Sequence, residues 1–140
     1  MTSTDLYSRA EPGLLLHQVV RPNSLTSPKR VNVSPDNESL QVALIALEKN
    51  QTFNPHYHTV HDRNMPKAQE SWVVIRGSVK VIYYDVDQKI ISEEKLSEGE
   101  ASITYHGGHN YVALSENALV YEFKTGPYLG VKADKVQING

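Results

Sequence analysis

The 140-residue chain contains no cysteine, which excludes disulfides, thiolate metal sites and cysteine nucleophiles. Its apolar runs, such as Leu14–Leu16 and Ala43–Leu47, are far shorter than the roughly 20 residues of a membrane-spanning helix. The net charge of −2 gives no basic field for a nucleic-acid backbone or an anionic membrane. Residues 1–12 lack the basic start and apolar core of a signal peptide. We therefore expect a cytoplasmic protein without nucleic-acid or membrane partners.

The composition is otherwise that of a globular protein. Hydrophobic residues make up 39% of the chain and charged residues 21%, which supplies enough apolar side chain for a core. A chain of this length suits one domain. Residues 22–39 are rich in Ser, Asn and Pro, and they predict an irregular connection with a short extended piece at Arg30–Val33. We expect residues 1–21 to form an N-terminal arm or strand and residues 22–138 to form the single domain.

From residue 40 onward the chain has the pattern of short β-strands. Each apolar run is enriched in Val, Ile and Tyr and is bounded by turn residues. Strands that recur every 8–12 residues or so indicate a sandwich or barrel, and no stretch has a sustained helical stripe. The sequence therefore predicts an all-β fold. The predicted strands are Gln41–Glu48, Glu70–Arg76, Val79–Tyr84, Ile90–Lys95, Ala101–Tyr105, Tyr111–Leu114 and Leu119–Lys124.

The first candidate for chemistry is the triplet His56-Tyr57-His58. In a strand the two histidines would point to the same side, about 7 Å apart, because side chains alternate between the faces. Two imidazoles so placed can chelate one divalent ion. A solvent-facing pair on an exposed strand is the alternative.

A carboxylate and a third histidine extend this set. Glu70 opens a predicted strand that ends at the turn residue Gly77, and His109 follows Gly107-Gly108. A lone buried Glu costs several kcal/mol unless it is paired or bound to a cation. Side chains on successive antiparallel strands can converge inside a barrel, so a metal would explain an inward-facing Glu70. The alternatives are a solvated strand end for Glu70 and a turn histidine bonded to backbone for His109.

This order of residues resembles the two-motif signature of the cupin superfamily. The sequence departs from that signature in three places. Gln51 stands where the first motif has glycine, and eleven residues separate His58 from Glu70 where the family has only a few. This longer spacing leaves His61 or Asp62 as alternatives to Glu70. In the second motif Tyr105 or His106 replaces proline, and one residue is missing before His109. The matching residues are His56, His58, Glu70 and Gly77 in the first motif and Gly99, Gly107 and His109 in the second.

Longer stretches resemble one cupin subgroup, the cupin-fold metalloproteins of the WbuC type that are often encoded in O-antigen gene clusters. These stretches are A-L-I-A-L-E-K-N-Q-T-F-N-P-H-Y-H, E-S-W-V-V-I-R-G and Y-E-F-K-T-G-P-Y, and the similarity covers about residues 22–138. The resemblance implies a cupin-like double-stranded β-helix, that is, a jelly-roll barrel, with an N-terminal arm. By context it also implies a sugar or nucleotide-sugar substrate. Small barrels of this kind commonly pair through N-terminal strands, so the apolar run Leu14–Val20 predicts a homodimer.

The ligand set that the resemblance implies is His56, His58, Glu70 and His109. Three neutral imidazoles and one carboxylate suit Fe, Mn, Ni or Zn, and the composition does not choose among these metals. Open coordination positions on such an ion would permit Lewis-acid polarisation of a carbonyl or hydroxyl, or activation of O₂.

Further side chains are candidates for contact with a substrate. His106, near His109, is a candidate acid or base, and a water-exposed loop histidine is the alternative. Trp72 has the same parity as Glu70, so it can line the cavity and stack on a sugar or ring, or it can be plain core. Tyr105 and Arg63 are candidate substrate-binding residues, with barrel packing and a solvated loop charge as their alternatives.

Three functions remain open at this point. The first is a metal-dependent enzyme of the isomerase or epimerase type that acts on a small polar metabolite in polysaccharide biosynthesis. The second is an Fe(II) dioxygenase. The third is a non-catalytic module that binds a sugar or a metal. The fold alone does not separate them, because one barrel architecture serves many chemistries.

Overall fold

The computed structural model of the chain describes residues 3–22, 29–56, 58, 68–126 and 136–138. These residues form β-strands and no helix, and the strand pairings are all antiparallel, so the all-β prediction is confirmed. No helix in this part of the chain is long and apolar enough to cross a membrane. The strands are β1 (Ser3–Tyr7), β2 (Leu15–Val20), β3 (Lys29–Asn32), β4 (Ala43–Ala46), β5 (Glu70–Arg76), β6 (Val79–Tyr84), β7 (Ile90–Leu96), β8 (Ala101–Thr104), β9 (Gly108–Ala113) and β10 (Leu119–Lys124).

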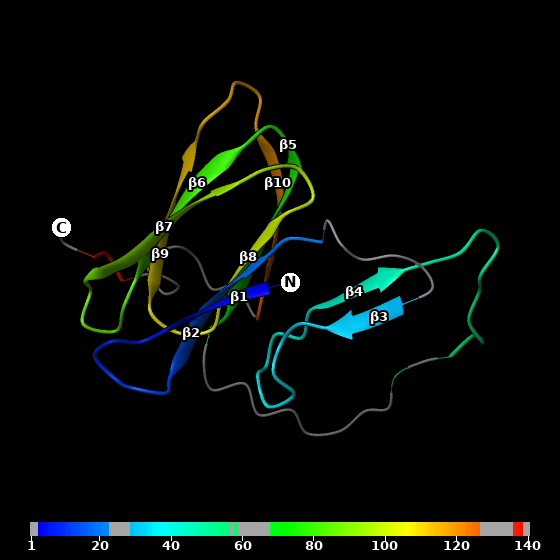
Figure 1. The fold of residues 1–140 in the computed structure, drawn as a ribbon, viewed down its shortest axis with the longest axis horizontal. Coiled ribbons are helices and arrows are strands. Elements are labelled where there is room, and N and C mark those ends of the chain that lie inside the picture. Colours follow the sequence, from blue (N-terminus) through cyan, green and yellow to red (C-terminus); the bar gives the residue numbers. More distant parts are fainter. Residues whose placement is uncertain (1–2, 23–28, 57, 59–67, 127–135, 139–140) are drawn as a thin grey trace.

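The strands form three sheets. A five-stranded sheet has the order β1-β2-β8-β5-β10, a three-stranded sheet has the order β7-β6-β9, and β3 pairs with β4 in a hairpin. Figure 1 shows the β3–β4 hairpin standing to the side of the two larger sheets. In both larger sheets, strands from distant parts of the chain lie next to one another, and this brings β5, β9 and β10 around one cavity.

The first hydrophobic core contains side chains of both larger sheets. In β6, Val79, Val81 and Tyr83 are buried, as the predicted alternation requires, and they pack with Val19 and Val74 of the five-stranded sheet. The hydroxyl of Tyr83 donates to Ser102 Oγ at 2.9 Å, so the one polar atom that Tyr83 brings into the core is satisfied. Burial raises the pKa of Tyr83 well above its usual value.

A second core covers the opposite face of the five-stranded sheet. There Ile103 and Tyr105 pack with residues before and within β4, such as Val42 and Leu44. The hydroxyl of Tyr105 donates to the buried Gln18 Oε1 at 2.6 Å. Because this sheet is covered on both faces, β8 is buried along its whole length.

Residues 3–20 contain two strands, β1 and β2, that belong to the five-stranded sheet. β1 pairs with β2, and β2 pairs with β8 on its other edge, so the run Leu14–Val20 has strand partners within its own chain. Beyond β1, the side chain of Asp85 accepts hydrogen bonds from Ser8 Oγ at 2.5 Å and from the backbone N–H of Arg9 at 2.7 Å. These bonds fasten the N-terminal segment to the β6–β7 turn. A homodimer stays a prediction, although the run proposed to form it lies inside the sheet.

Three strand predictions differ from the structure. The strand predicted at Tyr111–Leu114 is β9, Gly108–Ala113, so His109 lies within it. The predicted strand Gln41–Glu48 is reduced to Ala43–Ala46, because only these residues pair with β3. The described residues of the segment 47–58 contain no strand, so the alternation assumed for His56 and His58 does not apply. Instead, His56 Nδ1 lies 2.8 Å from the carbonyl oxygen of Asn54, a local contact typical of a turn.

Candidate functional site

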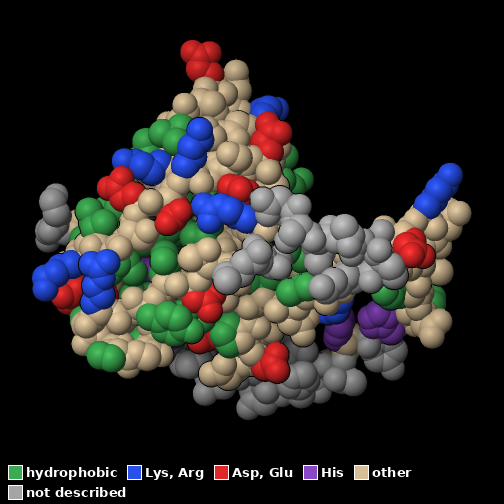
Figure 2. Space-filling model, in the orientation of Figure 1, with side chains coloured by type: hydrophobic (Ala, Val, Ile, Leu, Met, Phe, Trp, Pro, Cys, Tyr) green, Lys and Arg blue, Asp and Glu red, His purple; other side chains and the backbone are tan. Residues whose placement is uncertain are grey.

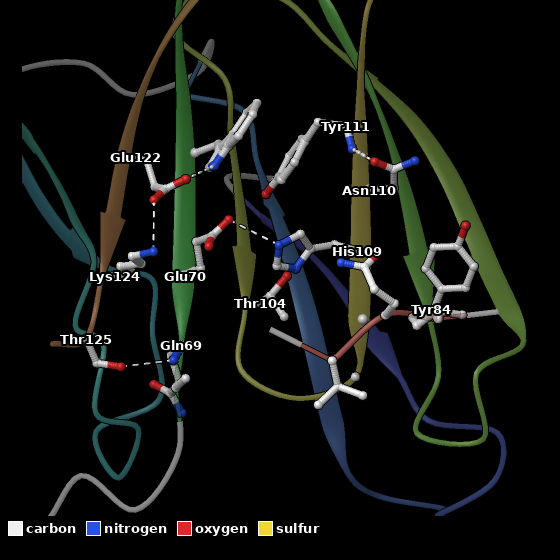
Figure 3. A pocket seen from close by; sticks show the side chains of 17 residues that line it. Gln69, Glu70, Tyr84, Thr104, His109, Asn110, Tyr111, Glu122, Lys124 and Thr125 are labelled. Atoms are coloured by element: carbon white, nitrogen blue, oxygen red, sulfur yellow. Dashed lines mark hydrogen bonds and ion pairs between the residues drawn. The ribbon is translucent and has the colours of Figure 1, made fainter. Parts of the chain in front are cut away.

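A cavity of about 590 Å³ opens between the five-stranded and the three-stranded sheet. Figure 3 shows labelled side chains of neighbouring strands around it, among them Glu70, Thr104 and His109. The side chains that define its chemistry are Glu70 and Trp72 from β5, His109 and Tyr111 from β9, and Glu122 and Lys124 from β10.

Glu70 and His109 form a hydrogen-bonded pair in the cavity. His109 Nε2 lies 3.1 Å from Glu70 Oε1, and the two side chains are only 23% and 15% exposed. Because a carboxylate is an acceptor, Nε2 carries the proton, and Nδ1 of the neutral ring keeps a lone pair. Among the described residues, this Nδ1 is buried and has no hydrogen-bond partner. A buried acceptor without a partner lowers the stability of the fold by about 1–3 kcal/mol. A ligand that donates a hydrogen bond to this nitrogen, or places a positive charge next to it, would therefore be stabilised there.

The turn before β9 fixes the position of His109. Gly107 has a φ of +75°, and a Cβ at this position would collide with the carbonyl oxygen of Tyr84. Only glycine allows this close approach, after which β9 pairs with β6 so that His109 lies opposite Tyr83. His109 and Tyr111 then lie two residues apart and face the cavity together.

An aromatic pair forms the wall next to Glu70 and His109. The rings of Trp72 and Tyr111 are stacked, with centroids 3.7 Å apart and planes 3° from parallel. Trp72 Nε1 donates to Glu122 Oε2 at 3.0 Å, and Lys124 Nζ lies 3.5 Å from Glu122 Oε1. Burial raises the pKa of Tyr111 well above its usual value, so its hydroxyl stays protonated. The wall is therefore flat and apolar, with charged groups at its edge.

A second histidine lies behind the cavity. His17 is fully buried in β2; its Nε2 lies 3.2 Å from the carbonyl oxygen of Tyr84 and its Nδ1 lies 3.0 Å from Thr104 Oγ1. The carbonyl is only an acceptor, so Nε2 is the donor and Nδ1 accepts from the Thr104 hydroxyl. Burial lowers the pKa of His17 to about 4, which keeps the ring neutral near pH 7. With both ring nitrogens bonded inside the fold, His17 has a structural role.

The four predicted metal ligands lie in two separate pairs in the structure. Glu70 contacts His109, whereas the rings of His56 and His58 lie 5.4 Å apart in an edge-to-face arrangement. Within the described part of the chain, no three His, Asp or Glu side chains gather around a point where an ion would fit. Figure 2 shows exposed histidine side chains near the β3–β4 hairpin, apart from the body of the larger sheets. The metal site stays a prediction.

The other candidate residues have different positions. Trp72 lines the cavity beside Glu70, on the face that the alternation assigns to it. Tyr105 does not line the cavity, because it packs in the second core on the opposite face of the sheet. His106 is also not among the lining residues, and its backbone N–H donates to Leu16 at 3.2 Å. Arg63, like the alternative ligands His61 and Asp62, lies outside the described residues.

Glu122 and Lys124 are lining residues that the sequence analysis did not single out. They share the inner face of β10 with Val120, which packs against the first core. The alternation of β10 would have put these three on one face. The sequence gives no local signal that β10 lies next to β5, and this neighbour is what turns the face toward the cavity.

The structure thus defines an all-β protein with a polar cavity between two antiparallel sheets. Comparison with family models gives a match to a domain of unknown function (DUF6016) over residues 16–96, which is more than half of the chain, and the chain belongs to this family. The match runs from β2 to the end of β7; it includes Glu70 and Trp72 and ends before the strands that supply His109 and Glu122. Comparisons with curated proteins and with solved structures found no match.

Proposed function

We propose that the protein is an acid–base catalyst of the isomerase or epimerase type, acting on a small polar metabolite such as a sugar or nucleotide-sugar intermediate. The single observation that supports this function is the buried, unpartnered Nδ1 of His109, whose ring is oriented by Glu70. A carboxylate that accepts from one ring nitrogen sets the tautomer and leaves the other nitrogen to act as a base.

The reaction needs no oxidant or reductant. His109 Nδ1 takes a proton from the carbon next to a carbonyl group, and the C–H electron pair moves toward the carbonyl to give an enolate. Where the α-carbon carries a hydroxyl, its O–H proton passes to the enolate oxygen and the proton on His109 returns to the former carbonyl carbon, which completes an isomerisation. Protonation of the α-carbon from the opposite side by a second acid completes an epimerisation, after which His109 releases its proton to solvent and the second acid takes one up. Glu70 stabilises the imidazolium that forms in between, and the ammonium of Lys124 supplies positive charge on the same cavity wall.

The aromatic wall supports a sugar-like ligand. Trp72 and Tyr111 offer apolar surface, and the carboxylate of Glu122 is a hydrogen-bond acceptor at its edge. Sugars combine apolar C–H faces with hydroxyl donors, so both parts of the wall match them.

A metal-dependent version is the second candidate, within a cupin-type jelly-roll barrel. The antiparallel sheets around the cavity and the two histidine-containing pairs support it, because imidazole and carboxylate donors suit Fe, Mn, Ni or Zn. Glu70 and His109 would hold the ion from the cavity; His56 and His58 lie apart from them in the structure and would have to approach them to complete the set. The ion would supply Lewis-acid polarisation of a substrate oxygen. A cytoplasmic location belongs to the same proposal.

The test follows deuterium uptake from D₂O by proton NMR, with a panel of ketoses, keto-sugar phosphates and nucleotide-linked keto-sugars. We expect exchange at the carbon next to the carbonyl of at least one member. His109→Gln should lower the rate by about 100-fold or more, because it removes the base. His106→Gln is the matched control and should retain the rate, since this histidine does not line the cavity.

The same preparations separate the alternatives. Exchange that survives a chelator supports proton transfer by the protein alone, and exchange lost with the chelator and in His56→Ala supports the metal-dependent candidate. Oxygen-dependent turnover would indicate a dioxygenase. Full exchange in His109→Gln would contradict the proposed function, and binding without exchange would leave a non-catalytic module.

A further inference from the structure

Residues 136–138 form part of the cavity wall beside the start of β9. They lie in neither helix nor strand, yet all three line the cavity, together with Gly108 and His109. Figure 3 shows this short segment, in pale red, close to Tyr84. Val136 is 94% exposed, whereas Ile138 is half-buried, so Ile138 is the residue by which the 136–138 segment is fastened.

Gly108 provides the space in which Ile138 lies. A Cβ at this position would collide with Ile138 Cδ1, whereas its distance from Tyr84 Cβ, 3.4 Å, would be an ordinary contact. The preceding Gly107 has a positive φ, but the φ of Gly108 is not positive, and Gly108 is already part of β9. The backbone at residue 108 therefore accepts a side chain, and the contact with Ile138 is what favours glycine there.

This contact lies next to the residue on which the proposed chemistry depends. Gly108 directly precedes His109, and both border the same cavity as Ile138. The 136–138 segment belongs to none of the three sheets, so packing against β9 holds it there and strand pairing does not. A segment held in this way separates from the rest of the fold at a lower free-energy cost than a paired strand.

We propose that the 136–138 segment is a strap that controls access to His109. With Ile138 seated against Gly108, the strap closes the cavity at the start of β9. When Ile138 leaves this space, the cavity opens there and admits a ligand. The strap follows from the geometry of the cavity and not from the proposed reaction, so access to His109 can be measured without turnover.

Diethyl pyrocarbonate measures this access, because it acylates neutral imidazole nitrogens that it can reach. Peptide mass spectrometry gives the rate of modification for each histidine. Gly108→Ala places a methyl group in the space of Ile138, so we expect His109 to react at least about fivefold faster than in the wild type. The rate at His58, which is exposed, should not change and is the internal reference.

Ile138→Ala should have the same effect, because it removes the anchoring side chain and adds nothing to β9. Val136→Ala is the matched control in the same segment, and it should leave the rate at His109 unchanged because Val136 is exposed. Unchanged thermal melting shows that the variants fold. A wild-type rate at His109 in both Gly108→Ala and Ile138→Ala would overturn the proposal.

The absence of native cysteine allows the strap to be locked. Ile138 Cγ1 lies 3.6 Å from the position of a Cβ at residue 108, so a disulfide can join the two positions in Gly108→Cys/Ile138→Cys. We expect His109 to be protected in the oxidised form and to react at least about fivefold faster in the reduced form. Equal rates in the two forms, or failure of the two cysteines to join, would contradict the strap.

The strap and the proposed function fail separately. Protection of His109 by the disulfide without deuterium exchange in any substrate of the panel would keep the strap and remove the proposed reaction. Deuterium exchange in a protein whose oxidised and reduced forms are modified equally fast at His109 would keep the reaction and remove the strap.

Discussion

His109 is the residue on which the proposed chemistry depends. Its position depends on Gly107, because a Cβ there would collide with the carbonyl oxygen of Tyr84. Its tautomer is set by the carboxylate of Glu70, which lies 3.1 Å from Nε2. The remaining ring nitrogen faces no partner among the described residues. Structural histidines are usually bonded at both nitrogens, as His17 is, so the difference between the two histidines points to a ligand at His109.

His17 should make the protein sensitive to mild acid. Its pKa is lowered by burial from the ordinary 6.5 to about 4, so between these values the unfolded chain binds a proton that the folded protein does not. The free energy of unfolding should therefore fall by about 3 kcal/mol as the pH is lowered from 6.5 to 4. Urea denaturation across this range measures the effect.

The matched variants are His17→Gln and the exposed His58→Gln. In His17→Gln this part of the pH dependence should disappear, because no buried imidazole remains to be protonated on unfolding. In His58→Gln it should persist, because His17 is still present. An equal slope in the wild type and in His17→Gln would contradict the assignment.

At the scale of elements, alternation predicted most strands but not their neighbours. The pattern of β6 predicted its buried face correctly, because the side chains at every second position lie on the same face of a strand. β8 was different: both of its faces are buried, so alternation could not tell that Thr104 faces the cavity while Tyr105 packs in the second core. Which strand lies beside which depends on long-range pairing that no local pattern encodes.

The same reasoning explains the outcome for the candidate site. Glu70 and Trp72 share a strand, so their common face could be predicted from parity alone. The contact of Glu70 with His109 joins two segments that are far apart in the chain. The family resemblance suggested that these two residues lie close together, whereas no local pattern did. His56 and His58 follow a hairpin without a further strand partner, and parity has no meaning for residues outside a strand.

Asp85 should be essential for fastening the N-terminal segment to the β6–β7 turn. Burial alone would raise its pKa, but the hydrogen bonds from the Ser8 hydroxyl and the Arg9 backbone N–H, with those from neighbouring N–H groups, lower it to about 2. Asp85→Asn replaces an acceptor oxygen by a donor, so we expect a loss of about 1–3 kcal/mol in the free energy of unfolding at pH 7. Denaturant titration measures it.

The exposed Asp87, two residues further on, provides the control. Asp87→Asn should change stability by less than about 0.5 kcal/mol, as is usual for surface positions. Because the folded-state pKa of Asp85 is depressed, its contribution is fully present above the ordinary value of 3.8 and is lost as the pH falls toward 2. Wild-type stability should therefore decrease in this window more steeply than that of Asp85→Asn.

At the scale of the whole molecule, a single sheet is covered on one face by the three-stranded sheet and on the other by residues before and within β4. The first contact encloses the cavity and its catalytic candidates. The second packs against residues of β2, β5 and β8. The five-stranded sheet therefore carries the cavity on one face and a hydrophobic core on the other.

The most direct test of the central claim is nitrogen NMR of the His109 ring near pH 8, with assignment by His109→Gln. We predict a neutral ring that carries its proton on Nε2 and a bare Nδ1, and a change of this tautomer in Glu70→Gln, whose amide can donate to Nε2. A wild-type ring with its proton on Nδ1 would contradict the account, because no base would then face the cavity.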